Sequence, residues 1–194
     1  ENSRRLESTR RLLGEQGVLD RLQPLPIRPI TPERLLRLHG EEYVARVRRL
    51  AEAGGGLLDP DTYVVEGSYA AALAAAGAAV ELTEAVMAGR AQRGISLMRP
   101  PGHHALGPGG MGFCIFNNIA IAARAARDEF GAERVLIVDW DVHHGNGTEA
   151  MFYGDPTVAF VSTHQYPFYP GTGAITDIGT GAGTGYNLNV PLSP

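Results

Sequence analysis

The stretch Val135–Gly147, which reads VLIVDWDVHHGNG, decides how the rest of the chain is interpreted. It opens with four aliphatic residues, and the next nine positions hold two aspartates, two histidines, an asparagine and two glycines. Consecutive apolar residues are typical of a strand buried on both faces of a parallel sheet. In open parallel sheets, ligands bind beyond the carboxyl ends of the strands. The stretch therefore predicts a strand that ends in a ligand site.

The side chains after this strand have the chemistry of metal ligands. Alternate residues of an extended backbone share a face, so we expect Asp139, Asp141 and His143 to point one way. Trp140 and Val142 are then expected to pack behind them. Carboxylate oxygens and imidazole nitrogens on one face can bind a divalent metal. A helix-capping aspartate and a structural histidine would explain one residue of each kind, but two of each lie within six positions. A metal site is the favoured interpretation.

A second histidine pair follows another apolar stretch, residues 94–98 (GISLM), which we expect to be a strand. His103 and His104 come directly after Pro100-Pro101-Gly102, where proline stiffens the backbone. Tandem histidines near a metal suit proton transfer, because an imidazole titrates near neutral pH. The alternative is a surface loop with an incidental pair, which a second pair after a second strand disfavours.

Aromatic residues follow a third predicted strand, residues 157–162 (TVAFVS). Phe168 and Tyr169 precede Pro170-Gly171 on a loop. They either pack in the core or form an apolar wall for a substrate. The second interpretation is the more specific of the two. His164 has no partner in view and is assigned no role.

Hydrophobic periodicity alternates between helices and strands along the chain. Helices are expected over residues 2–14, from Thr31-Pro32-Glu33 onward, over 40–54, over 68–88 and over 117–130. A further strand is expected to begin at Asn187. This alternation predicts an α/β domain with a mainly parallel central sheet, and residues 1–194 are read as one domain.

Composition narrows the functional classes. The 194 residues are 44% hydrophobic and 20% charged, an ordinary globular balance. The net charge is −4 without a basic stripe, so direct binding of nucleic acid is not expected. Cys114 is the single cysteine, which rules out a disulfide within the sequence and leaves the cytoplasm as the default location. No apolar run of membrane-spanning length and no signal peptide is apparent, so no membrane association is expected.

Four motifs together resemble the histone deacetylase superfamily within the arginase/deacetylase fold. They are RPPGHHA (99–105), GFCIFNN (112–118), VDWDVHHGNGT (138–148) and PFYPGTG (167–173). The resemblance covers nearly the whole chain. The motif WDVHHGNGT, with its asparagine, resembles the motif of the class II branch and its bacterial relatives, the acetylpolyamine amidohydrolases and acetoin-utilisation deacetylases. The resemblance implies a three-layer fold and a zinc-dependent deacetylase.

The resemblance implies a role for each matching residue. Asp141 and His143 match two of three zinc ligands, and His103 and His104 match the tandem catalytic histidines. Asp139 matches the carboxylate partner of the first histidine. The implied reaction is amide hydrolysis, in which zinc polarises the acetyl carbonyl and activates water. His104 is the general base that takes the water proton and then helps to protonate the amine.

Further matches concern substrate binding. Asn146 matches the partner of the second catalytic histidine. Phe113 and Tyr169 match the aromatics that flank the acyl-lysine tunnel, although position 169 is more often Phe in this family. Gly112 matches the residue whose carbonyl accepts the substrate amide N–H. Asp61, which precedes the motif EGSY, matches an aspartate at the rim that holds the substrate backbone.

The resemblance also implies a potassium site and two missing groups. Asp139 and Ser162 match potassium ligands, together with main-chain oxygens of His143 and Thr163. The third zinc ligand of the family is an aspartate in a later glycine-rich loop, and the catalytic tyrosine lies later still. Both are expected beyond Pro194. We therefore expect this sequence to be a piece of a longer protein, cut at both ends and inactive alone, with the domain incomplete on its C-terminal side.

Alternatives from other classes remain open. The leading hypothesis is a zinc-dependent deacetylase acting on acetyl-lysine in a protein, on an acetylpolyamine or on another small acetylated molecule. A non-catalytic binding or regulatory module on the same scaffold is the second. An arginase-like binuclear manganese hydrolase is the third, but it would need an aspartate where this chain has Gly145. The sequence leaves the substrate and the oligomeric state undetermined.

Overall fold

The computed structural model describes residues 2–194. The helices and strands follow in the order α1 (Arg4–Glu15), η1 (Leu19–Arg21), α2 (Pro32–Leu35), α3 (Glu41–Glu52), β1 (Gly55–Asp59), β2 (Thr62–Val65), α4 (Ser68–Met87), α5 (Asn118–Asp128), β3 (Val135–Asp139), α6 (Asn146–Phe152), β4 (Val158–Gln165), η2 (Gly181–Gly183) and β5 (Asn187–Leu192). The five predicted helices are present, and three of the predicted strands form the central sheet.

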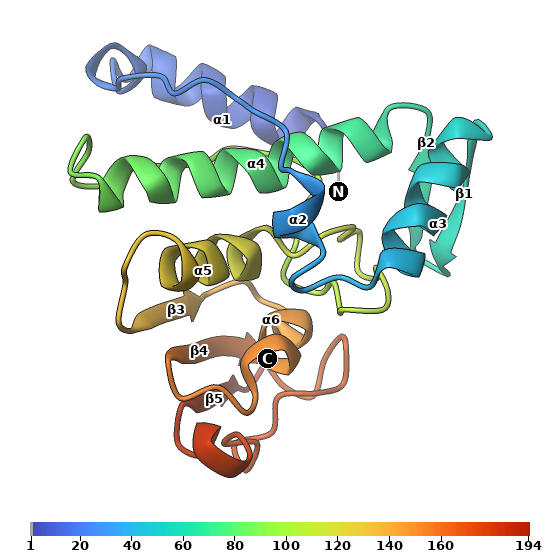
Figure 1. Ribbon diagram of the computed structural model, residues 1–194, viewed down its shortest axis with the longest axis vertical. Coiled ribbons are helices and arrows are strands. Elements are labelled where there is room, and N and C mark those ends of the chain that lie inside the picture. Colours follow the sequence, from blue (N-terminus) through green and yellow to red (C-terminus); the bar gives the residue numbers. More distant parts are fainter. Residues whose placement is uncertain (1) are drawn as a thin grey trace.

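Helix α4 lies between α1 and α5 (Figure 1) and contributes to the larger of two hydrophobic cores. Its small side chains, including Ala72, Ala76 and Val80, are buried against α3 and α5. Within the described part of the chain, α4 is the one helix long and apolar enough to span a bilayer by length and composition. The prediction that no segment reaches that length is therefore wrong, although these buried residues serve the core of a folded domain.

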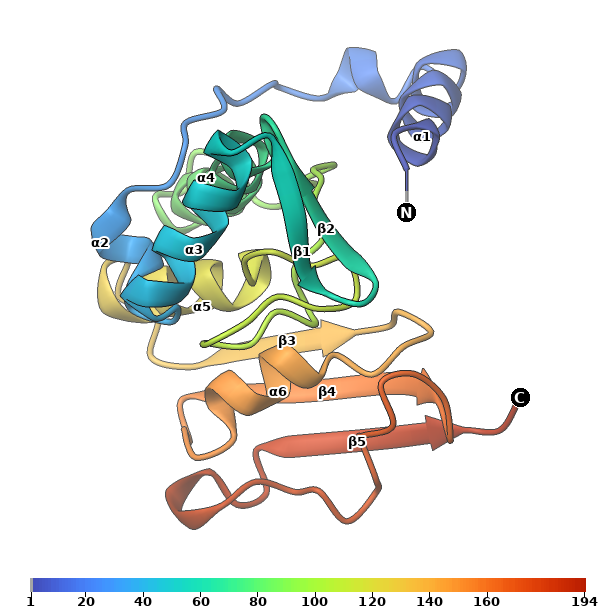
Figure 2. The ribbon, with the colours of Figure 1, turned by 90° about the vertical axis from the view of Figure 1, so that its right-hand side faces the viewer.

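The central sheet has the order β3-β4-β5, and all its strand pairs are parallel. Figure 2 shows the three strands side by side and pointing the same way, so their carboxyl ends share one edge. One face, which carries Ile137, Phe160 and Asn187, is buried beneath α5 and α6. This arrangement confirms the predicted α/β architecture and places the ends of β3 and β4 together.

The opposite face of the sheet is open in the described residues. Leu136 is 62% exposed, Val138 49% and Leu188 49%. The apolar run in β3 therefore predicted burial on two faces, whereas residues 2–194 cover only one. A parallel sheet in an α/β protein has both faces covered, so these side chains form an apolar surface that calls for a partner layer.

Four local predictions are corrected by the structure. Residues 94–98 form no strand, because no described segment pairs with them to make a ladder. A β1–β2 antiparallel hairpin lies where only a glycine-rich helix end was expected. Strand β3 ends at Asp139, so Asp141 and His143 lie in the following loop. Trp140 and Val142 do not pack behind the site, since they are 83% and 51% exposed.

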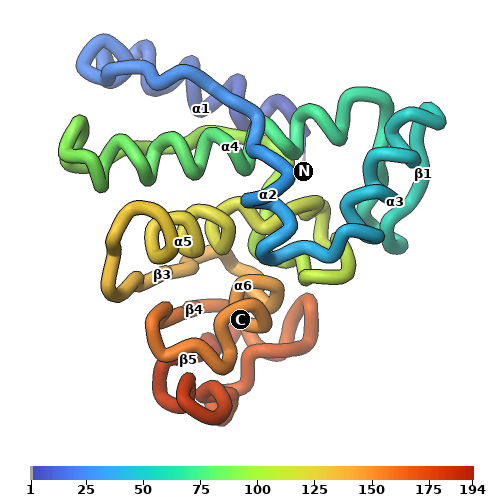
Figure 3. The backbone as a smooth tube through the Cα atoms, viewed as in Figure 1, coloured from blue at the N-terminus to red at the C-terminus, as the bar shows by residue number. Residues whose placement is uncertain are grey.

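The connection between α4 and α5 brings one wall of the site into place. The tube in Figure 3 shows residues 88–117 running beneath α4 and looping toward α3 before α5 begins. Gly107 O accepts a hydrogen bond from Gly40 N at 3.1 Å, which fixes this loop to the start of α3. Asn117 caps α5, because its Oδ1 accepts from Ala120 N at 3.1 Å. These two contacts fix the part of the segment that follows the histidine pair.

Candidate active site

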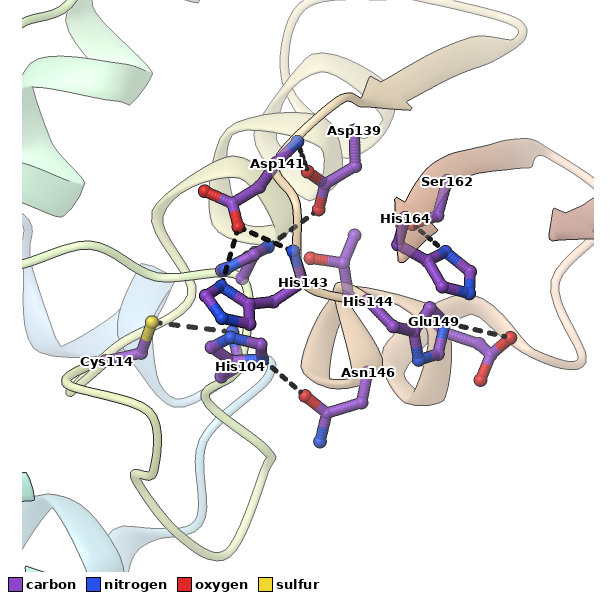
Figure 4. A network of polar contacts seen from close by, with 12 residues as sticks. His104, Cys114, Asp139, Asp141, His143, His144, Asn146, Glu149, Ser162 and His164 are labelled. Carbon is purple, nitrogen blue, oxygen red and sulfur yellow. Dashed lines mark hydrogen bonds and ion pairs between the residues drawn. The ribbon is translucent and has the colours of Figure 1, made fainter. Parts of the chain in front are cut away.

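His104 and His143 come together beyond the carboxyl end of β3, as the close view in Figure 4 shows. The His103 and His104 ring centroids lie 4.0 Å apart, and the His104 and His143 centroids lie 5.9 Å apart. His103 O also accepts hydrogen bonds from Gly147 N and Thr148 N at the start of α6. The backbone itself therefore joins the two segments that the sequence separates by about forty residues.

Each tandem histidine has its own side-chain partner. His103 Nδ1 lies 2.8 Å from Asp139 Oδ2, and His104 Nδ1 lies 2.8 Å from Asn146 Oδ1. The Asn146 amide nitrogen faces Met111 Sδ at 3.5 Å, which supports the orientation of its oxygen toward His104. Both rings therefore donate through Nδ1 to an oxygen that can only accept.

Asp141 and His143 present a matched pair of donor atoms. His143 Nδ1 lies 3.0 Å from Asp141 Oδ1, and His143 N donates to the same oxygen at 2.9 Å. Ligand atoms placed ~2.0 Å from a tetrahedral zinc lie about 3.3 Å apart, so the pair fits two corners of such a site. Among residues 2–194, no group of three or more His, Cys, Asp or Glu side chains is placed to hold a metal. The described chain thus brings together two donor side chains of this kind, Asp141 and His143.

The electrostatic environment differs between His104 and Asp141. Burial, and then the neighbouring His103 ring, lower the pKa of His104 to about 4, although the hydrogen bond to Asn146 opposes this. Burial by itself would raise the pKa of Asp141, but hydrogen bonds from His143 and the nearby imidazoles hold it below its usual value. At neutral pH the site therefore has a neutral imidazole beside a carboxylate.

Gly112 and Phe113 form a tight wall against the second histidine. Both have positive φ angles, +57° and +66°. A Cβ at Gly112 would lie 2.4 Å from His104 Cδ2, so only glycine fits this approach. Gly112 N donates to Asp61 Oδ1 at 3.0 Å, and Phe113 N donates to Thr62 Oγ1 at 2.9 Å. The start of β2 thus holds the backbone that carries Phe113.

The predicted aromatics stand around the histidines. Tyr169 lies edge-on to the rings of His104 and His143, at centroid distances of 5.1 and 5.8 Å. Phe168 stacks on His143 at 5.2 Å. Phe113 is 47% exposed. Burial and then Asp61 raise the pKa of Tyr169, so its hydroxyl stays neutral at neutral pH.

The predicted potassium ligands are neighbours in the sheet. Asp139 and Ser162 are register partners across β3 and β4, and Ser162 is fully buried. The Ser162 hydroxyl lies 3.0 Å from His164 Nδ1. His164, assigned no role from the sequence, contacts Gly173 O through Nε2 at 2.9 Å and is buried.

Gly145 bears on the arginase-like alternative. A Cβ at this position would lie 2.2 Å from Asp139 Oδ2 and 3.2 Å from Phe160 Cζ. An aspartate here would collide with the carboxylate that supports His103. An aspartate would therefore require Asp139 to move, which disfavours the binuclear arrangement at this site.

Several residues of the site carried no recognisable signal in the sequence. Cys114 is buried behind the second histidine, and its Sγ accepts from His104 N at 3.5 Å. Burial raises the pKa of this thiol to about 12, which makes it inert. His144, Thr172 and Glu149 form a second polar cluster directly behind His143. In the sequence, His144 stood out only as the second member of the pair His143-His144.

Comparison with known proteins places this geometry in context. The model of the family described as histone deacetylase domain matches residues 1–194. The histone deacetylase-like amidohydrolase of Pseudomonas aeruginosa is 48% identical over 195 residues, which cover 100% of this chain and 50% of that protein. A probable deacetylase of Archaeoglobus fulgidus is 42% identical over 196 residues, which cover 100% of this chain and 54% of that protein.

A solved structure is also similar. The crystal structure of the HDA15 HD domain superposes with a TM-score of 0.95 at 42% sequence identity, over 98% of this chain and 54% of that one. The chain therefore spans about half the length of the relatives that it matches.

Proposed function

Because this chain belongs to the histone deacetylase domain family, we propose that the full-length protein is a zinc-dependent deacetylase that hydrolyses acetylated amines. The observation that carries the proposal is the neutral, buried His104 beside the Asp141–His143 donor pair. A base with its Nδ1 fixed by a hydrogen bond and its Nε2 facing the site is what amide hydrolysis by water requires.

Asp141 and His143 would hold the zinc ion with a third ligand supplied by the remainder of the protein. When bound, zinc supplies Lewis acidity, which polarises a carbonyl and lowers the pKa of water. The described residues contain two fitting donors, and a catalytic zinc site normally has three protein ligands. The half of the relatives' length that this chain does not span is where we place the third ligand and the tyrosine that completes the site. That remainder would also cover the open face of the sheet.

The residues of this chain supply the other functions that the reaction needs. His104 Nε2 takes the proton of the attacking water and returns it to the leaving amine. His103, held by Asp139 at 2.8 Å, supports the charge that develops beside it. The Gly112 carbonyl accepts the substrate N–H, and Phe113 with Tyr169 contacts the aliphatic chain that carries the acetyl group.

Asp61 would hold the substrate at the rim. Its Oδ1 accepts hydrogen bonds from Gly112 N and from Thr62 Oγ1 at 2.7 Å. Burial opposes ionisation, but these hydrogen bonds keep the pKa of Asp61 below its usual value. The ionised carboxylate retains its second oxygen to accept an N–H from the substrate.

Potassium would bind beside this site, at Asp139 and Ser162 with the main-chain oxygens of His143 and Thr163. The support is the register pairing of Asp139 with the buried Ser162. A cation here would brace the backbone on the far side of the zinc ligands. Activity that is identical in potassium-free and potassium-containing buffer would contradict this part of the proposal.

The decisive experiment is an assay of the full-length protein on acetyl-lysine peptides, acetylpolyamines and small acetylated amines. We expect turnover of at least one class, its loss on chelation and its return on addition of zinc. A protein that binds zinc stoichiometrically but hydrolyses none of the three classes would instead be a non-catalytic module on this scaffold.

A further inference from the structure

A buried polar cluster lies directly behind the segment that carries His143 and Asn146. His144 is 1% exposed and turns away from His143 into the protein (Figure 4). Its Nδ1 lies 2.8 Å from Thr172 Oγ1, and its ring packs on His164 at 4.7 Å. The same loop that carries the aromatics Phe168 and Tyr169 is therefore attached to the metal-ligand segment through His144.

Glu149 connects this histidine to the far strand of the sheet. Asn187 and Asn189 of β5 donate their Nδ2 atoms to Glu149 Oε1, at 2.6 and 2.7 Å. His144 Nε2 lies 3.5 Å from the same oxygen, which is an electrostatic contact longer than an ordinary hydrogen bond. Among residues 2–194 the Nε2 atom has no hydrogen-bond partner, so Glu149 is the acceptor that faces it.

The carboxylate of Glu149 stays charged in this position. Burial opposes ionisation, but the nearby His144 ring and the hydrogen bonds from Asn189 and Asn187 hold the pKa of Glu149 below its usual value. A charge this deep in the fold costs free energy unless polar groups surround it, and here two amide N–H donors and the His144 ring do so. None of these groups touches the reacting atoms, and no step of the proposed reaction uses them.

From this geometry we propose that Glu149 and His144 are positioning residues, which set the backbone of residues 143–146 for metal binding and catalysis. This segment presents the His143 ring at one end and the Asn146 amide at the other. A shift of the backbone would therefore move a zinc ligand and the partner of His104 together. The inference rests on the proposed function, because it assigns these residues a role in the same site.

The test uses two near-isosteric variants of the full-length protein and one matched control. Glu149→Gln removes the charge that faces His144, and Thr172→Val removes the contact at the other side of the ring. Asp155→Asn is the control, because Asp155 also accepts three hydrogen bonds, from Arg124 and twice from Thr157. It precedes β4, at the opposite end of the sheet from the site.

Three quantities are measured for each variant: the zinc Kd by chelator competition, kcat and KM on an acetylated substrate, and the melting temperature. We expect Glu149→Gln to weaken zinc binding by roughly 10-fold or more and to lower kcat with little change in KM. Thr172→Val should shift the same quantities less. Asp155→Asn should lower the melting temperature and leave the zinc Kd unchanged.

Two outcomes overturn the inference. The first is a Glu149→Gln protein that loses melting temperature as Asp155→Asn does and keeps the parental zinc Kd and kcat. If Glu149→Gln does not fold, Thr172→Val decides, and parental zinc Kd and kcat in that variant count against the proposal. Asp141→Ala is measured in parallel, because parental zinc affinity in that variant would refute the proposed function itself.

Discussion

His104 Nδ1 lies 2.8 Å from Asn146 Oδ1, and this contact determines which nitrogen of the histidine faces the site. An amide oxygen can only accept, so Nδ1 carries the hydrogen and Nε2 keeps its lone pair. The partner is neutral, which leaves burial free to hold the pKa of His104 at about 4. A carboxylate in its place would stabilise the imidazolium form and raise that pKa.

The first prediction follows from this pair. Asn146→Asp in the full-length protein should raise the pKa of His104 and move the acid limb of the kcat/KM profile to higher pH. The base works in its neutral form, so a higher pKa means that activity is lost at a higher pH as the solution is acidified. The pH–rate profile of both proteins checks this. An acid limb that stays in place would mean that His104 is not the base, or that Asn146 is not its partner.

Zinc ligation gives the second prediction. Asp141→Ala or His143→Ala should remove zinc and activity together, because each supplies one of the two donor atoms that fit the metal. Asp139→Asn should be milder for zinc, about 10–100-fold in affinity or activity, since Asp139 holds His103 instead. Metal analysis of the purified variants checks the order. Stoichiometric zinc in Asp141→Ala would contradict it.

The third prediction concerns the close approach of Gly112 to His104. Gly112→Ala would place a Cβ 2.4 Å from His104 Cδ2, so the ring must move. We expect kcat to fall by roughly 10²-fold with zinc content unchanged, because small displacements of a catalytic group have effects of that size. Gly109→Ala on the same loop is the control, since a Cβ there meets nothing within 4 Å. Equal losses in the two variants would point to general loop damage.

The fourth prediction is a stability change with pH that originates away from the site. His39 is buried, its Nε2 accepts from Asn117 N at 3.0 Å, and burial lowers its pKa to about 4. The unfolded chain, with a pKa near 6.5, takes up a proton that the folded protein refuses. Stability should therefore be lost as the pH falls from about 6.5 toward 4, by up to about 3 kcal/mol at this residue.

The variant His39→Gln tests whether His39 causes this loss of stability on acidification. Glutamine offers an acceptor for Asn117 N but cannot be protonated, so its variant should lose less stability on acidification than the parent. Chemical denaturation at several pH values gives the comparison. His104 shifts in the same direction and remains in both proteins, so only the difference between the two curves is attributed to His39. Parallel curves would remove His39 as a source of acid sensitivity.

The sequence predicted the elements whose signal is local. The alanine-rich helix α4 and the apolar strands β3 and β4 formed where periodicity placed them. The segment 94–98 was wrong as a strand because a ladder depends on a neighbour, which periodicity within one segment does not report. The direction of Trp140 was wrong for a related reason: β3 ends one residue earlier, and strand alternation ends with it.

Site chemistry was predictable where several rare residues stood together, as in His103-His104 and around Asp141. Glu149 carried no such signal, since a single glutamate in a helix is ordinarily solvated. Its partners Asn187 and Asn189 come from a strand almost forty residues away. Only the parallel register of β4 and β5 brings these amides over the start of α6.

The last prediction is that residues 1–194, expressed alone, do not deacetylate any substrate. They supply two fitting zinc donors where a catalytic site normally has three, and the described residues contain no group of three. Loss of an oxyanion donor such as the expected tyrosine would alone cost roughly 10²–10³ in rate. The open sheet face, with Leu136 and Val138 exposed, should also make the isolated chain bind hydrophobic dyes and associate.

Side-by-side assay of this chain and the full-length protein, for zinc content and for hydrolysis of an acetyl-lysine peptide, checks the prediction. Comparable turnover that is lost on chelation would mean that the third ligand lies within this chain. Asp177, in the loop between β4 and β5, would then be the first residue to mutate.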